Sequence, residues 1–214
     1  NTHGACVKIR HLLARRLARY GSLQEARQYY PESLLKVFDS YCANISAATD
    51  SGTPKERKAE AYWEAAKIAR FNGLELFGTE LEPDWFYHDG SYEEGPTFSE
   101  RKNSGLAPPS ADEHERAAKS VPSPNKRLHY RYNAADLAWK AAELMPDNSD
   151  MKAVVLCSAG TWLKNRDPEQ ADKFYKALVR RCRKTEIGEA ADKMRWFPVL
   201  DENGQIKKKA AAGQ

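Results

Sequence analysis

The chain has 214 residues, of which 41% are hydrophobic and 30% charged, a composition typical of a globular protein. It has no apolar run near the roughly 18 residues that a membrane-spanning helix requires, so the sequence predicts no membrane span. The formal net charge of +4 is too small to favour nucleic acid as the main partner.

The first 77 residues show helical periodicity. Apolar side chains at steps of four, four and three share one helical face at Ile9, Leu13, Leu17 and Tyr20. The pattern predicts helices over 9–20, 23–30, 31–45 and 54–77, with breaks at 21–22 and 49–53. We expect Thr53 to cap the fourth helix and Pro54 to occupy its first position.

Glycine and proline interrupt this pattern over residues 78–123. A long irregular stretch inside a compact domain is usually functional or disordered. We interpret it as an insertion with two parts. Residues 78–98 are rich in aromatic side chains and are expected to pack, whereas residues 99–123 are polar and are expected to be mobile.

Helical periodicity returns at about residue 126 and predicts helices over 126–144, 149–164, 168–182 and 186–195. Ser149 and Asp167 stand where helix caps are expected, and Pro168 follows at a first helical position. Residues 199–214 are interpreted as a tail. Because no segment alternates with the period of a β-strand, the predicted fold class is all-α, in a single domain.

Small residues recur at positions where paired helices would touch. Ala134, Ala138 and Ala141 precede Pro146, and the pattern continues through Ala159-Gly160, Ala171 and Tyr175; Ala14, Gly21 and Ala26 follow a similar pattern. In these segments the chain resembles the tetratricopeptide repeat, a helix–turn–helix unit of about 34 residues. Residues 78–87 and 174–182 are also similar to bacterial repeat proteins to which no reaction is assigned.

This resemblance implies an α-solenoid of stacked antiparallel helical hairpins, repeat-like over 7–77 and 126–195 and interrupted by the irregular insertion 78–123. It implies a protein- or peptide-binding scaffold with no catalytic activity, within a larger protein or assembly. It also implies a bacterial source. Because the chain opens on Asn1, we expect a processed or truncated N-terminus, in either the cell envelope or the cytoplasm.

The aromatic-acidic segment 80–94 is the first candidate contact surface. Its candidate contact residues are Glu80, Glu82, Asp84, Trp85, Tyr87, His88, Asp89 and Tyr92. Aromatic rings and carboxylates together can bind a sugar, and a carboxylate pair can hydrolyse a glycosidic bond. This gives an alternative function, a carbohydrate-binding or carbohydrate-hydrolysing helical domain. The other interpretation packs the aromatic side chains against the helices and leaves the acids in water.

Two basic helix faces form the second candidate surface. Residues 8–19 and 173–184 contain lysine and arginine but no acid, and we select Arg15, Arg19, Arg180 and Arg181 as contacts for an acidic partner. A solvated face is the alternative interpretation.

The sequence predicts no metal and no cofactor. The four cysteines and five histidines lack metal-ligand spacing, and neither a phosphate-binding loop nor a nucleophile elbow occurs. All four cysteines fall at or near apolar helical positions, where we expect free, buried thiols. The partner and the oligomeric state do not follow from the sequence.

Overall fold

The computed structural model describes residues 2–80, 110–119 and 128–207. Within these ranges the secondary structure is helical, as the sequence predicted, apart from one isolated antiparallel bridge between Leu200 and Ile206. The contacts divide the chain into two compact units: Asn1–Gly78 together with Tyr130–Gln214, and Thr79–His129. Each unit is described by itself.

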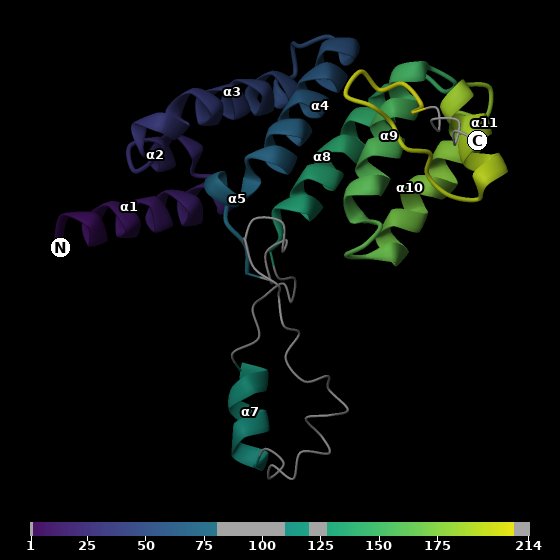
Figure 1. Cartoon of the computed structure of the whole chain (residues 1–214). Helices are drawn as coiled ribbons and strands as arrows, with labels where there is room; N and C mark the ends of the chain where they lie inside the picture. The colour runs from purple at the N-terminus through teal and green to yellow at the C-terminus, as the bar shows by residue number, and fades with distance from the viewer. Residues whose placement is uncertain (1, 81–109, 120–127, 208–214) are drawn as a thin grey trace, which may run out of the picture. The chain divides into compact units, whose positions relative to one another are not determined.

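Of the helices that the structure describes, all except α7 lie in the first unit (Figure 1). They are α1 (Thr2–Arg19), α2 (Leu23–Arg27), α3 (Glu32–Thr49), α4 (Lys55–Phe71), α5 (Gly73–Leu76), α8 (Tyr130–Leu144), α9 (Asp150–Leu163), α10 (Pro168–Arg181) and α11 (Glu186–Met194). The main contacts join the longer helices in order: α3 packs on α4, α4 on α8, α8 on α9, and α9 on α10. The helix α11 packs on α9 and α10, while α1 packs on α2 and α5.

Buried alanines are concentrated on α4 and α8, the two helices that share the most extensive contact. The fully or almost fully buried alanines are Ala59, Ala61, Ala65, Ala66 and Ala69 on α4, and Ala134, Ala135, Ala138, Ala141 and Ala142 on α8. Small side chains let two helix backbones approach closely. The small-residue pattern of the sequence therefore marks helix contacts, as expected.

The helix ends agree with the predictions in part. Ser149 Oγ accepts a hydrogen bond from Lys152 N, and Asp167 caps α10 through Gln170 N, both as predicted. The predicted cap at Thr53 was wrong, because Thr53 Oγ1 donates to Asp50 Oδ2 and Pro54 takes the N-cap position.

The predicted helix over 54–77 divides at Asn72 into α4 and α5. Gly73, which begins α5, lies directly against the Tyr130 side chain: a Cβ on Gly73 would meet Tyr130 Cβ at 2.5 Å. The local sequence does not reveal this contact, because Tyr130 lies 57 residues further along the chain.

Helix α1 has an unexpected orientation. Among the residues of α1 whose burial is described, Ala14 and Ala18 are buried, whereas Ile9, Leu13 and Tyr20 from the apolar stripe are exposed to solvent. The periodicity correctly predicted the helix, but of the stripe only Leu17 is half-buried.

The second unit contains α7 (Ala111–Lys119), which lies within the stretch predicted to be irregular. The two ends of this unit are joined by hydrogen bonds. Glu80 N donates to Leu128 O at 2.8 Å, and Leu128 N donates to Glu80 Oε2 at 3.1 Å.

The segment 199–214, predicted to be a tail, begins with ordered structure, since the bridge between Leu200 and Ile206 lies within its first residues.

Candidate functional site

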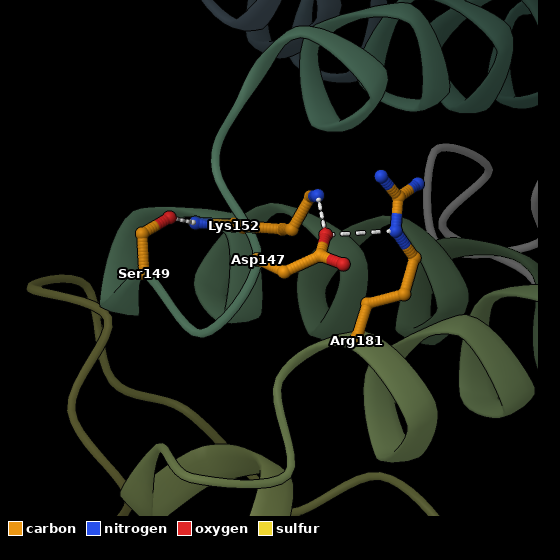
Figure 2. Close-up of polar contacts among 4 residues, drawn as sticks. All are labelled: Asp147, Ser149, Lys152 and Arg181. Atoms are coloured by element: carbon orange, nitrogen blue, oxygen red, sulfur yellow. Dashed lines mark hydrogen bonds and ion pairs between the residues drawn. The ribbon is translucent and has the colours of Figure 1, made fainter.

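A charged cluster lies where the loop between α8 and α9 meets the end of α10 (Figure 2). Asp147 Oδ1 is 2.5 Å from Lys152 Nζ and 3.0 Å from Arg181 Nε. Lys152 is fully buried on α9, where most of the other buried residues are apolar. A buried ammonium group needs an anionic partner, and Asp147 supplies it.

The backbone around Asp147 holds this cluster in place. Asn148 has a positive φ of 58°, a conformation that asparagine adopts more readily than most residues. Its N–H donates to Arg181 O at 2.7 Å, and its side-chain oxygen accepts from Lys184 N at 3.0 Å. The loop is therefore tied to the end of α10 by both backbone and charge.

The electrostatics of the cluster favour a structural role, a clamp in which one carboxylate holds two cations. Hydrogen bonding from Lys152, with a smaller contribution from Arg181, lowers the pKa of Asp147 below its ordinary value. Asp147 therefore remains a carboxylate at neutral pH, and both cations keep their partner. Sequence reasoning selected Arg181 but missed Asp147 and Lys152; a lysine on the apolar side of a predicted helix was the available signal.

A shallow cleft of about 260 Å³ lies beside α9 in the first unit. Its lining includes Phe71, Ser158, Trp162, Lys164, Val199 and Asp201. The Trp162 ring stacks on Trp63 with ring centroids 5.6 Å apart, and Phe71 meets Trp162 edge-on at 6.3 Å. Aromatic contacts thus join α4 to α9 and form one wall of the cleft.

The cleft combines apolar walls with polar groups at its border. Phe71 is 59% exposed and Val199 is 57% exposed, so both rims offer apolar surface to solvent. Ser158 and Thr161 contribute hydroxyl groups, while Lys164 and Asp201 contribute opposite charges. The volume is below that of most drug-sized pockets and matches one apolar side chain of a peptide with its adjoining backbone. Sequence reasoning did not identify this site, since its residues come from α4, α9 and the segment after α11.

The predicted basic contacts on α1 make hydrogen bonds to backbone carbonyls. Arg15 Nε donates to Glu75 O at 2.9 Å, and Arg19 Nε donates to Phe77 O at 2.5 Å. Together with His11 Nε2, which bonds Glu75 O at 2.7 Å, they satisfy carbonyls at the C-terminal end of α5. Burial is the main cause that lowers the pKa of His11. These arginines thus attach α1 to α5.

The other predicted contacts are spread along the chain. Arg180 is exposed on α10, and Arg181 belongs to the Asp147 cluster. Glu80 binds the Leu128 backbone within the second unit. The remaining predicted contacts lie outside the described residues: Glu82, Asp84, Trp85, Tyr87, His88, Asp89 and Tyr92.

The cysteines differ from one another in exposure. Cys157 and Cys182 are buried as predicted, Cys42 is half-buried, and the prediction was wrong for Cys6, which is exposed on α1. Burial raises the pKa of Cys42 to about 11 and that of Cys157 to about 12, so these thiols stay protonated at neutral pH.

In the part of the chain that the structure describes, no three His, Cys, Asp or Glu side chains gather as a metal site would require. Among the same residues, no helix has the length and apolarity to cross a membrane. No protein-family profile matches the chain, and no significant match is found among curated proteins or solved structures.

Proposed function

We propose that this chain is a protein- or peptide-binding helical-repeat scaffold without catalytic activity, within a larger protein or assembly. The observation that carries the proposal is the cleft beside α9, with the exposed apolar side chains of Phe71 and Val199 at its borders. Exposed apolar side chains around a cleft with polar groups at its border are typical of surfaces that bind a side chain of a partner protein.

The order of helix contacts supports the scaffold part of this proposal. From α3 to α10 the main contacts link α3 to α4, α4 to α8, α8 to α9 and α9 to α10, and only the four-residue α5 separates α4 from α8 among the described helices of the first unit. In repeat proteins each element likewise contacts its neighbours. The segment resembling a tetratricopeptide repeat coincides with α8, α9 and α10. Such arrays generally present surface for other chains rather than a catalytic pocket.

The test is selection of peptides from a random phage-displayed library on the purified chain, followed by calorimetry with the enriched peptides. Phe71→Glu puts a carboxylate at the apolar border, and we expect it to weaken binding at least tenfold, or about 1.4 kcal/mol. Met151→Glu is the matched control, because Met151 is an exposed apolar residue on α9 that does not line the cleft.

Equal binding to the wild type and to Phe71→Glu would contradict the cleft as the site. Failure to enrich any peptide that distinguishes the folded chain from a heat-denatured sample would contradict the proposed function itself.

A further inference from the structure

The segment that follows α11 borders the cleft beside α9 (Figure 1, yellow). It is fixed to α9 at two points. Cys157 Sγ donates to Pro198 O at 3.5 Å, and a Cβ on Gly204 would meet Val154 Cγ2 at 3.0 Å. Residues 199–201 lie between these points in the sequence and line the cleft. The cleft is therefore lined by a short bridged strand as well as by helices.

Leu200 has a backbone edge without a partner. The two hydrogen bonds of its bridge to Ile206 are made by its neighbours, since Val199 O accepts from, and Asp201 N donates to, the backbone of residues 205–207, both at 2.8 Å. In this antiparallel pattern the N–H and C=O of Leu200 point away from the paired strand. Neither group is bonded to another residue that the structure describes. An extended peptide can bond both groups, as a strand added to the edge of a sheet does.

Lys164 is the available cation of the cleft. It is the C-cap residue of α9, and it forms no ion pair with a described residue. The carboxylate of the cleft belongs to Asp201, whose Oδ1 already accepts from Asn203 N at 2.9 Å and Gln205 N at 2.8 Å. The positive charge is therefore open to a ligand, whereas the negative charge is stabilised by its own backbone.

Two of the last carbonyls of α9 are bonded within the chain. Trp162 O accepts from Arg131 Nη1 at 2.6 Å, and Leu163 O accepts from Arg166 N at 2.9 Å. Such bonds weaken the partial negative charge of a helix end, which would otherwise oppose an anion beside Lys164.

The size of the cleft selects among anionic peptides. Its volume of about 260 Å³ matches one apolar side chain with its adjoining backbone. An acidic residue inside a chain needs room for a second side chain, whereas the last residue of a chain carries an apolar side chain and a carboxylate on the same Cα. An N-terminal amine would instead face the like charge of Lys164.

We propose that the cleft beside α9 binds the free C-terminus of a partner protein, in extended form and with an apolar last residue. The terminal carboxylate pairs with Lys164, the last side chain packs on Phe71 and Trp162, and the peptide backbone bonds the free edge at Leu200. This inference rests on the proposed function above and names the kind of peptide that the same cleft takes.

The experiment uses a library of eight-residue peptides that is displayed with free C-termini and varies at the last four positions. Each enriched peptide is synthesised with a fluorescent label in two forms, one ending in a carboxylate and one in an amide. We expect an apolar last residue in the selected pool. Fluorescence anisotropy should show at least tenfold tighter binding of the acid than of the amide, because only the acid pairs with the ammonium group.

Variants of Lys164 assign the carboxylate. Lys164→Gln should bind the acid and the amide equally, whereas Lys164→Arg should keep the preference for the acid because the charge remains. Lys55→Gln is the matched control. Lys55 is an exposed lysine at the opposite end of α4 from Phe71, so this variant should bind like the wild type.

Leu200→Pro tests the backbone edge. Proline removes the free N–H without removing a hydrogen bond of the 199–207 hairpin, whereas Leu200→Ala shortens the side chain alone. We expect weaker binding to Leu200→Pro than to Leu200→Ala, with the folding of both judged by circular dichroism. If Leu200→Pro does not fold, the acid peptide is methylated at each of its last three backbone nitrogens in turn, and at least one methyl group should weaken binding tenfold.

Equal binding of the acid and the amide by the wild type would overturn the proposal, as would a preference for the acid that persists in Lys164→Gln. Equal binding to Leu200→Pro and Leu200→Ala, or no effect of any methyl group, would exclude the extended mode. In each case, peptides without a free C-terminus that depend on Phe71 would still support the proposed function. Only the loss of both kinds of peptide would contradict that function itself.

Discussion

At the residue scale, several charged side chains fasten segments of the chain to one another. Asp147 holds the buried Lys152 and the partly exposed Arg181 at one junction, while Arg15 and Arg19 bond carbonyls near the end of α5. A basic residue in the sequence can face solvent, a partner or a carbonyl of its own chain. Only the neighbours in space distinguish these roles. The sequence therefore predicted Arg15 and Arg19 as contacts for a partner, whereas in the structure they bond carbonyls of their own chain.

Replacing Asp147 with asparagine should lower the stability of the first unit, because the Lys152 ammonium then stays buried without its anion. The pKa of Asp147 is lowered in the folded chain, so its contribution is present above the ordinary value of 3.8 and is lost as pH falls through the folded pKa. Melting curves of the wild type and Asp147→Asn should therefore differ at pH 7 and converge in acid.

Arg181→Gln is the matched control for this prediction. Arg181 is 36% exposed and can be rehydrated, so its loss should lower the melting temperature less than Asp147→Asn does. An equal melting temperature for Asp147→Asn and the wild type at pH 7 would show that the ion pair contributes nothing.

At the element scale, small residues decide how closely helices approach. Gly160 on α9 lies against Phe197, so that a Cβ there would come within 2.1 Å of the buried ring. Helix propensity alone favours alanine over glycine by about 1 kcal/mol. The sequence shows where small residues recur, but not which of them lies against a ring from another segment.

Gly160→Ala should lower the free energy of unfolding by about 1–3 kcal/mol, because overpacking at Phe197 outweighs the gain in helix propensity. Gly52→Ala is the control: its Cβ would meet only Asp50 Oδ2, at an ordinary 3.5 Å. Urea denaturation measures both variants. A Gly160→Ala chain as stable as the wild type would mean that Phe197 moves aside without cost.

At the scale of the whole molecule, the chain consists of two units, and the second is inserted in the sequence of the first. The glycine and proline content predicts an insertion at residues 78–123 within a single domain, and the contacts separate Thr79–His129 as a second unit. Composition could not predict α7 within it, nor the hydrogen bonds between Glu80 and Leu128 that join its ends. Those bonds link residues 48 positions apart.

Replacing residues 79–129 with a six-residue Gly/Ser linker should leave the first unit folded. Gly78 N bonds Gly73 O at 3.1 Å, and the Tyr130 side chain also lies against Gly73, so a short linker can join Gly78 to Tyr130. We expect helical circular dichroism and a melting temperature within a few degrees of the full chain, since the linker also closes a short loop. An unfolded product would mean that the first unit depends on the second.

For the described residues, the sequence by itself determined the helical class, most helix positions and the caps at Ser149 and Asp167, because periodicity and capping are local properties. Tertiary structure alone decided which side of α1 is buried, the break at Asn72, the clamp around Asp147 and the cleft beside α9. Each of these depends on contacts between segments far apart in the chain. Their geometry follows from packing, which local sequence patterns do not encode.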